Sequence, residues 1–388
     1  MSKKSKPNNK RVRTNKNNKK VKVDLARIKV VGVGGAGGKI ISRIAQRKKI
    51  KGVKFIAINT DIQDLNHLGR SRAAKAIQKV AVGQDLTHGL GAGMNPELGQ
   101  QAVEESRQQI SELLKGANIV FVVAGLGGGT GSFGSSVVAD ISKQQGILTI
   151  GVVTKPFSFE GLQRKKIADQ ALEKLSKKVD TLIVIPNDRI FKLVDRNTSL
   201  IKAFRLIDDV LKDAISSIVE VIVSTGLINL DLADIKVIMS DGGPALVGTG
   251  LAYGSQRAVK AASLAINSPL LETSIEGARG VLFCVSGRKD LKLSEVNTVA
   301  KMITENVNPG AKIIFGAYYD QNIRKDGLKV TLIATKLSGI RQDYQLTKEP
   351  EPLFSDEFQK SKPKSIEISQ PTELEKKLEK PAFLRRKR

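Results

Sequence analysis

Residues 125–136 read GLGGGTGSFGSS, and five of the first seven are glycine. Glycine loses the most conformational freedom on folding, so such a run persists either as a slack linker or where something must approach the main chain closely. The preceding run, NIVFVVA (118–124), is apolar and β-branched, which is typical of a strand buried on both faces of a parallel sheet. The following SSVVADISKQQG (135–146) has helical spacing. A glycine turn between such a strand and a helix favours phosphate binding over a bare tight turn, because free N–H groups and the positive helix end attract anions.

Strand-like and helix-like patterns alternate from Arg27 to about Asn187. The expected strands contain IKVVGVG, FIAIN, VAVG, IVFVVAG, LTIGVV and TLIVIPN. The sequence PELGQQAVEESRQQISELLKG (96–116) is predicted to form one amphipathic helix. This alternation predicts an α/β fold with a doubly wound, mostly parallel sheet that binds ligands at the carboxyl ends of its strands.

The rhythm changes after a long helical pattern at about 200–224. Three further strands are expected in GVLFCVSG, KIIFGAYYD and LKVTLIAT, with helices in QRAVKAASLAI and LSEVNTVAKMITENV. They predict a second, smaller α/β domain. From about Leu337 the chain is polar with scattered Pro, Lys and Glu, which is typical of a disordered linker, and it ends on the apolar and basic KPAFLRRKR.

Composition excludes several classes of protein. With one cysteine, Cys284, and two histidines, His67 and His88, neither an internal disulfide nor a cysteine-based or histidine-rich metal site is expected. No apolar run approaches ~18 residues, and none follows the charges at the N-terminus, so neither a membrane span nor a secretory signal is expected. We therefore expect a cytoplasmic protein.

The formal net charge is +26, and residues 1–23 supply ten Lys or Arg and no acid. This composition predicts a solvated, disordered basic N-terminal arm. Ten cations also attract polyanions, so contact with an anionic membrane or with nucleic acid is open. Aromatic residues make up 4% of the chain and Trp is absent, which argues against platforms for base stacking.

A second glycine cluster, GVGGAGGK (32–39), follows the first expected strand. Its glycines match the dinucleotide pattern G-x-G-x-x-G, and Asp61 ends the second strand near the expected ribose position. An NAD-dependent Rossmann oxidoreductase is therefore an alternative. The P-loop pattern fails, because Val33 and Ile40 stand where it needs glycine and Ser/Thr.

Two glycine loops on one sheet suit a chain of phosphates better than either loop alone. Main-chain N–H groups would hold the phosphates, and the hydroxyls of Thr130 and Ser132 would add to them. A dehydrogenase has no evident use for the second loop, and it usually presents a proton-relaying side chain. His88 is the single candidate for that role, and a structural or surface position is the more common one for a histidine.

Nine motifs, in their order and intervals, resemble the tubulin/FtsZ family and its bacterial cell-division protein FtsZ in particular. They are GVGGAGGK, NTD, LTHGLGAGMNPELG, GLGGGTGS, TKPFSFEG, IPND, GLINLDLADIKVIMSDGG, NSPLL and IIFGAYYD. The resemblance covers about residues 27–336, and PAFLRR (381–386) resembles the family's C-terminal peptide. It implies a GTP-binding and GTP-hydrolysing cytoskeletal protein that polymerises head-to-tail, as in the division ring of bacterial cytokinesis.

The resemblance also implies a GTP site. The glycine loops would wrap the phosphates, the sequence NTD would approach the γ-phosphate and its Mg²⁺, and Glu160 and Arg164 would hold the ribose side. Phe204 would stack on the guanine, and Asp208 would accept hydrogen bonds from its N–H edge. The residues expected at GTP or GDP are Gly34, Gly35, Ala36, Gly37, Gly38, Lys39, Asn59, Thr60, Asp61, Gly127, Gly128, Gly129, Thr130, Gly131, Ser132, Glu160, Arg164, Asn187, Phe204 and Asp208.

The catalytic residues are expected in NLDLAD (229–234). From the residues alone, this stretch reads as a helix start that Asp231 caps and whose dipole favours both acids. The resemblance adds that the loop projects into the nucleotide site of the next subunit, where Asp231 and Asp234 would orient and polarise the attacking water, with Asn229 nearby. Hydrolysis is then tied to a head-to-tail contact that does not close and so builds filaments.

Several positions depart from the family. Ser255 and Gln256 stand where an acidic pair is usual, which alters the longitudinal contact surface, and two more departures concern the glycine loops. Lys39 stands where the family usually has Asn, and it either adds charge to the phosphate site or points to solvent. Phe133 replaces the last glycine of the signature, which leaves open whether it crowds that loop. None of these changes affects the catalytic acids, so an active GTPase is expected. A nucleotide-sensing relative that does not polymerise is a third alternative.

The patterns and the resemblance together divide the chain and suggest its partners. The C-terminal peptide is expected to bind proteins that tether the filament to the membrane, which places the protein in the cytoplasm at the division site. The expected segments are the basic arm (1–23), a GTP-binding domain (24–198), a central helix and connection (199–228), a C-terminal α/β domain beginning with the catalytic loop (229–338), a linker (339–378) and the partner-binding peptide (379–388).

Overall fold

The computed structural model describes most of the chain between residues 27 and 337. The described residues are 27–47, 52–68, 76–192, 198–199, 202, 206, 209, 211, 214–216, 218–219, 227–228, 231–268, 274–321 and 323–337. They all belong to the first of two units, Met1–Thr347 and Lys348–Arg388. The predicted arm, linker and C-terminal peptide lie outside the described residues. No helix in the described part is long and apolar enough to cross a bilayer.

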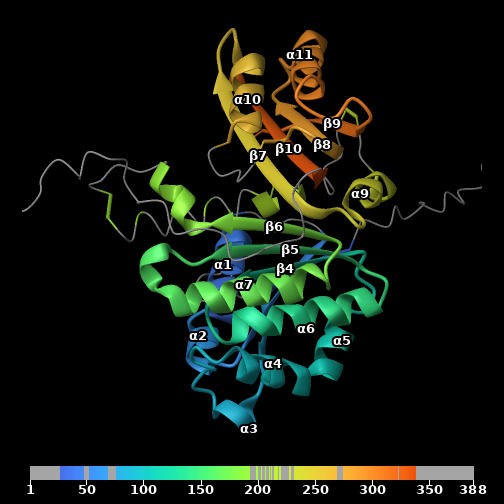
Figure 1. The fold of residues 1–388 in the computed structure, drawn as a ribbon. Coiled ribbons are helices and arrows are strands. Elements are labelled where there is room, and N and C mark those ends of the chain that lie inside the picture. Colours follow the sequence, from blue (N-terminus) through green and yellow to red (C-terminus); the bar gives the residue numbers. More distant parts are fainter. Residues whose placement is uncertain are drawn as a thin grey trace, which may run out of the picture. The chain divides into compact units, whose positions relative to one another are not determined.

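The N-terminal domain alternates strands and helices as the sequence predicts (Figure 1). Its strands follow the order β3-β2-β1-β4-β5-β6, and every neighbouring pair is parallel, which is a doubly wound order. Its elements are β1 (Ile28–Val33), α1 (Gly34–Arg47), β2 (Val53–Asn59), α2 (Ile62–His67), β3 (Ile77–Ala81), α3 (Gln84–Thr87), α4 (Pro96–Glu105), α5 (Arg107–Leu114), β4 (Ile119–Gly125), α6 (Thr130–Gln144), β5 (Leu148–Lys155), η2 (Ser158–Glu160), α7 (Leu162–Ser176), β6 (Thr181–Pro186) and η3 (Asn187–Lys192).

The C-terminal domain continues the same sheet in the order β7-β10-β8-β9. Strand β10 is antiparallel to β7 and β8, whereas β8 and β9 are parallel. Three parallel residue pairs between β6 and β7 join the two domains, and seven of the nine strand pairings are parallel. The elements are α9 (Leu232–Met239), β7 (Gly243–Tyr253), α10 (Arg257–Ile266), β8 (Ala278–Gly287), α11 (Leu293–Thr304), β9 (Lys312–Tyr319) and β10 (Gly327–Leu337).

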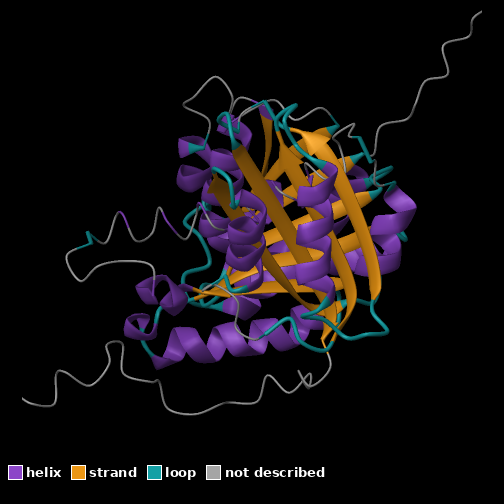
Figure 2. Cartoon of the chain, turned by 90° about the horizontal axis from the view of Figure 1, so that it is seen from above, coloured by secondary structure: helices purple, strands orange, loops and turns teal. Residues whose placement is uncertain are grey.

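Helices cover both faces of the sheet. Helices α4 to α7 pack on one face of the N-terminal strands, and α1 and α2 pack on the other (Figure 1). In the view turned by 90°, the strands run through the middle with helices around them (Figure 2). Helices α10 and α11 close a third apolar cluster against β7, β8 and β10. The near-continuous apolar strands are explained by this burial on both faces.

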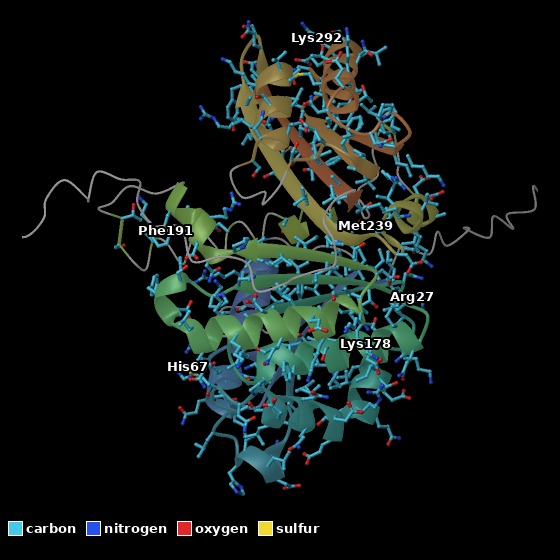
Figure 3. The ribbon with its side chains drawn as sticks, viewed as in Figure 1. Arg27, His67, Lys178, Phe191, Met239 and Lys292 are labelled. Carbon is cyan, nitrogen blue, oxygen red and sulfur yellow. The ribbon has the colours of Figure 1, made fainter. Side chains whose placement is uncertain are left out.

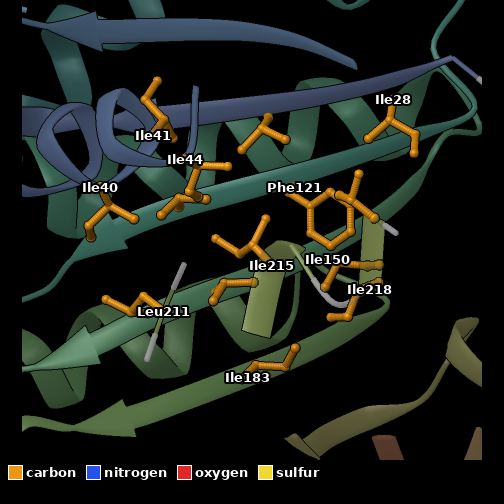
Figure 4. Packing of buried hydrophobic residues seen from close by; sticks show 14 of the residues in the cluster. Ile28, Ile40, Ile41, Ile44, Phe121, Ile150, Ile183, Leu211, Ile215 and Ile218 are labelled. Atoms are coloured by element: carbon orange, nitrogen blue, oxygen red, sulfur yellow. The ribbon is translucent and has the colours of Figure 1, made fainter. Parts of the chain in front are cut away.

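Part of the predicted central helix lies in the core beside α1. Leu211, Ile215 and Ile218 are helical, almost fully buried and part of the core cluster that contains Phe121 and Ile150. Figure 4 shows Ile215 and Ile218 near these two residues of the sheet. The spacing of the three helical residues, four and then three positions, gives a single apolar stripe. The rest of the pattern at 200–224 lies mostly outside the described residues.

Two local expectations differ from the structure. The predicted helix at 96–116 is two helices, because Ser106 leaves the helical conformation (φ −93°, ψ 15°) and Arg107 is tied to α6 through Asp140 at 2.6 Å. Strand β7 was not predicted, because its glycines and proline mask the strand pattern. Those glycines allow close packing: a Cβ added at Gly248 or Gly250 would lie 2.0 Å from a carbonyl oxygen of α10.

Candidate active site

The backbones of the two glycine loops lie against each other at the carboxyl ends of adjacent strands. Strands β1 and β4 are paired in parallel up to Val33 and Ala124, so the loops that follow leave the same edge of the sheet. Gly34 has a left-handed conformation (φ +73°), and a Cβ there would lie 2.9 Å from the nitrogen of Gly131. A Cβ at Gly128 would meet no atom within 4 Å. The second loop therefore presents open main chain directly before α6, where a helix start attracts anions.

The hydroxyls expected at the phosphates form hydrogen bonds within the protein. The Oγ1 atoms of Thr60 and Thr130 are 2.7 Å apart, and they connect the end of β2 to the second glycine loop. The Oγ of Ser132 is fully buried and accepts a hydrogen bond from the N–H of Gly127 at 3.0 Å. Both contacts fix the conformation of the loops in advance, which lowers the entropy cost of binding a ligand there.

The stretch NTD ends β2 beside the glycine loops. Asn59 and Thr60 are buried, and Asp61 is half-buried at the N-cap of α2, where its Oδ1 accepts from the N–H of Asp64 at 3.0 Å. Lys39 Nζ is 3.5 Å from Oδ1 of Asp64. Lys39 therefore reaches an acid beside the glycine loops and remains largely exposed. Asp64 was not predicted at the site, although its position three residues after Asp61 at a helix start could have indicated it.

The expected ribose side is an ordered turn. Glu160 accepts hydrogen bonds from the N–H of Phe157 and from Arg164 Nη1, both at 2.9 Å. The carboxylate of Asp188 accepts from the N–H and hydroxyl of Ser158, which fastens this turn to the end of β6. The turn after β5 and the segment after β6 therefore meet at the carboxyl ends of these two paired strands.

Asn187 carries the clearest sign of a missing partner. It is buried at the carboxyl end of β6, and its Oδ1 has no hydrogen-bond partner in the described structure. Buried polar atoms are nearly always hydrogen-bonded, because an unpaired one costs about 1–3 kcal/mol. A ligand that donates a hydrogen bond at this position would satisfy Asn187. Of the other expected residues, Phe204, Asp208 and Asn229 lie outside the described residues.

The two predicted catalytic acids form a reciprocal cap at the start of α9. Asp231 Oδ1 accepts from the N–H of Asp234 at 2.8 Å, and Asp234 Oδ2 accepts from the N–H of Asp231 at 3.2 Å. The helix-capping prediction is therefore confirmed. Asp231 is exposed and Asp234 is half-buried, so both side chains are accessible at the surface of the subunit.

Helix α9 lies at the opposite end of the sheet from the glycine loops. The carbonyl of Met239, its last residue, accepts a hydrogen bond from Thr181, the first residue of β6. Figure 3 shows Met239 on the same side as Arg27 and Lys178, which precede β1 and β6, whereas Phe191, which follows β6, lies on the other side. The structure therefore does not bring Asp231 and Asp234 together with the glycine loops of their own subunit.

Phe133 does not occupy the glycine loop. Its ring is buried in the apolar cluster between the sheet and α4 to α7, and Lys174 Nζ lies 3.5 Å from the ring centroid. The open main chain at Gly128 is left unobstructed. Exposed His88, in a left-handed turn after α3, has no catalytic surroundings in the described structure.

The chain matches two family models that together span most of the described residues. Residues 27–195 match the tubulin/FtsZ family GTPase domain, and residues 243–338 match the FtsZ family C-terminal domain. The GTPase match sets aside the alternative of an NAD-dependent oxidoreductase.

Solved structures agree with these matches. The FtsZ dimer of M. jannaschii is 42% identical, with a TM-score of 0.75, over 84% of this chain and 95% of that one. Two Haloferax volcanii proteins share the fold. GDP-bound CetZ1 is 23% identical, with a TM-score of 0.70, over 81% of this chain and 96% of that one. The GTPγS-bound protofilament of CetZ2 is 21% identical, with a TM-score of 0.66, over 79% of this chain and 92% of that one. The chain belongs to the tubulin/FtsZ family and combines its GTPase domain with the C-terminal domain of FtsZ.

Proposed function

We propose that this chain binds GTP between its two glycine loops and hydrolyses it when the next subunit of a head-to-tail filament supplies Asp231 and Asp234. The observation that carries this proposal is the position of α9, the helix that begins with the two acids, because its last residue, Met239, contacts the first residue of β6. Strand β6 has six residues, which span about 20 Å, and the glycine loops lie beyond its other end. A carboxylate side chain does not bridge that distance, so catalysis within one subunit is unfavourable.

Both ends of the sheet carry exposed apolar side chains that suit such a contact. Around the glycine loops, Leu90 and Leu162 are more than three-quarters exposed, and Phe159 is 55% exposed. At the other end, Val237 of α9 is 46% exposed. Exposed apolar patches mark interaction surfaces, and a contact between two different faces builds an open filament. The M. jannaschii FtsZ dimer and the CetZ2 protofilament support assembly in this family.

Several described features support nucleotide binding at this site. The open main chain at Gly128 and the start of α6 suit phosphates, and the unpaired Oδ1 of Asn187 suits a donor on the nucleotide. Glu160 and Arg164 would hold the ribose side. Phe204 and Asp208 are proposed to stack on and read the guanine, and Asn229 to assist the catalytic acids.

Mg²⁺ would be held jointly with the nucleotide. The described residues contain no cluster of three or more His, Cys, Asp or Glu that could hold a metal ion by themselves. Mg²⁺ commonly binds through one or two carboxylates together with substrate phosphates, and Asp61 offers a carboxylate beside the loops. Once bound, the ion would offset part of the phosphate charge.

Catalysis in this arrangement depends on position and charge. Phosphoryl transfer needs little covalent chemistry from the protein, and a positioned carboxylate that accepts a proton from water contributes about 10²–10⁴-fold. Asp231 and Asp234 are already fixed to each other by their reciprocal hydrogen bonds. The assembled contact would therefore add a pre-oriented pair of acids to the γ-phosphate of the neighbouring subunit.

The test is the rate of GTP hydrolysis per subunit against protein concentration, with light scattering recorded alongside. A shared site predicts a rate that rises above a threshold concentration, together with scattering. A rate per subunit that is independent of concentration would contradict the shared site. Binding of GTP without scattering at any concentration would instead favour a nucleotide-sensing protein that does not polymerise.

In the cell we propose that the filament forms the cytoplasmic division ring of bacterial cytokinesis. The segment boundaries 1–23, 24–198, 199–228, 229–338, 339–378 and 379–388 are part of this proposal. Phe383 and Leu384 would anchor the C-terminal peptide on a membrane-tethering partner, with Arg385 and Arg386 as a charged rim.

The basic arm is proposed to contact anionic membrane or nucleic acid. Its ten cations would each contribute at most about 1 kcal/mol near an anionic surface, and salt would screen the attraction. Deletion of residues 2–23 should leave GTP hydrolysis intact and reduce co-sedimentation with anionic vesicles or DNA at low salt. Unchanged binding to both polyanions, or loss of hydrolysis, would contradict this role.

A further inference from the structure

Asp64 holds its carboxylate against the first turn of α1. A Cβ placed on Gly35, the second residue of α1, would lie 2.4 Å from Oδ2 of Asp64. The other carboxylate oxygen, Oδ1, is 3.5 Å from Nζ of Lys39, one turn further along α1. The N–H of Asp64 is held by Asp61, so the backbone at this point is fixed. One carboxylate therefore lies between the amino end of α1 and the ammonium group of Lys39.

This position is unusual because the same helix end borders the proposed phosphate site. Helix α1 has no acid in its own first turn, and its positive end favours anions. Asp64 supplies an anion there before any phosphate arrives. The carboxylate of Asp64 is 35% exposed and the Lys39 side chain 61%, so water screens the pair and it can separate readily.

The assembled site would bring more negative charge to this point. Asp61 and Asp64 are two acids three residues apart at a helix start, and Asp231 and Asp234 repeat that pattern on α9. In the proposed filament, both pairs approach one triphosphate. Among the ion pairs that the structure describes, Lys39 is the one cation that contacts either Asp61 or Asp64.

We propose that Asp64 makes binding of the triphosphate depend on a divalent cation, and that Lys39 limits this dependence by offsetting the charge of Asp64. The inference rests on the proposed function, because it takes the glycine loops as the GTP site. Without a divalent cation, Asp64 repels the γ-phosphate. With Mg²⁺ present, the same carboxylate is a favourable neighbour, since Mg²⁺ prefers oxygen ligands.

The test measures the affinity of a fluorescent GTP analogue and of its GDP counterpart, below the assembly concentration, in EDTA and in saturating Mg²⁺. The variants are Asp64→Asn, Lys39→Gln and the double variant, with Asp85→Asn as a control on an exposed acid in the first turn of α3. In EDTA, Asp64→Asn should bind the GTP analogue about two- to fivefold tighter than wild type, the range of an exposed charge pair. Lys39→Gln should weaken binding by a similar factor, but only when Asp64 is present.

The gain of Asp64→Asn should be smaller for the GDP analogue and should disappear in saturating Mg²⁺, and Asp85→Asn should match wild type throughout. If Asp64→Asn and wild type gain the same factor in affinity from Mg²⁺, the inference is overturned while the GTP site stands. A wild-type chain that binds neither nucleotide in either buffer would overturn both the inference and the proposed function. Circular dichroism of each variant checks that the overall helix content remains that of wild type.

Discussion

Replacing Asp234 separates its two possible roles, because the side chain both caps α9 and is proposed to act on the neighbouring nucleotide. Asp234→Ala removes both functions. Asp234→Asn removes the charge but keeps an oxygen that can accept from the N–H of Asp231, the bond that measures 3.2 Å in the structure. The stronger half of the cap, from the N–H of Asp234 to Asp231 Oδ1 at 2.8 Å, uses the backbone of Asp234 and persists in both variants.

The magnitudes of the two effects differ enough to decide between them. Loss of a helix cap costs about 0.5–2 kcal/mol, and only the weaker half of this cap is lost in Asp234→Ala, so about 1 kcal/mol is expected. Even if all of it appeared in the activation barrier, the rate would fall only about fivefold. Loss of a catalytic carboxylate slows the reaction about 10²–10⁴-fold.

The assay is steady-state GTP hydrolysis above the assembly threshold, with nucleotide affinity and sedimentation of filaments measured in parallel. Both variants should bind GTP within about twofold of wild type, hydrolyse it at least about 100-fold more slowly and leave long-lived filaments. Asp241→Asn is the matched control, since this exposed acid follows the same helix. A wild-type rate in Asp234→Asn, with a loss below about fivefold in Asp234→Ala, would refute the catalytic role.

Three further predictions concern packing and charge. Glu295 is held by buried Arg257 at 2.7 and 2.9 Å, which lowers the pKa of its carboxyl below the ordinary value near 4.5. Glu295→Gln should therefore lower the free energy of unfolding, measured with urea, by about 2–3 kcal/mol at neutral pH. The difference between wild type and variant should disappear as the pH falls through that lowered pKa, because the carboxylate is then protonated. A difference that does not change with pH would contradict the ion pair. Phe133→Ala should cost about 3–5 kcal/mol of stability and leave GTP affinity within about twofold, whereas a large gain in affinity would show that the ring does crowd the loop. Gly99→Ala should weaken GTP binding, because its Cβ would lie 2.6 Å from the carbonyl oxygen of Gly129; unchanged affinity in a titration would show that the second loop tolerates displacement.

Much of the fold could be predicted from local patterns. Strands β1, β2, β4, β5 and β6 are apolar runs because most of their residues on both faces are buried. The position of each glycine loop, between a strand and a helix, was also predictable from the sequence. Strand β7 escaped prediction because its glycines serve the close approach of α10, a contact between segments that the local pattern does not show.

The site was less predictable, since its geometry depends on contacts between distant segments. Sequence identified Thr130 and Ser132 by type, but their hydrogen bonds to Thr60 and Gly127 depend on how β2 and the second loop pack. The contact of Asp64 with α1 likewise joins two helices whose spacing the sequence does not set. The unpaired oxygen of Asn187 became visible only once its burial was known.

The most direct test of the shared site mixes two variants that are inactive for opposite reasons. Asp234→Ala keeps its glycine loops, and Gly128→Glu keeps its acids but fills the open space at the second loop with a charged side chain. Each variant alone should hydrolyse GTP at least about 100-fold more slowly than wild type. In an equal mixture, random assembly pairs intact loops with intact acids at roughly one quarter of the head-to-tail contacts, so a comparable fraction of the wild-type rate should return. A mixture that stays as inactive as its components would contradict a site completed by the next subunit.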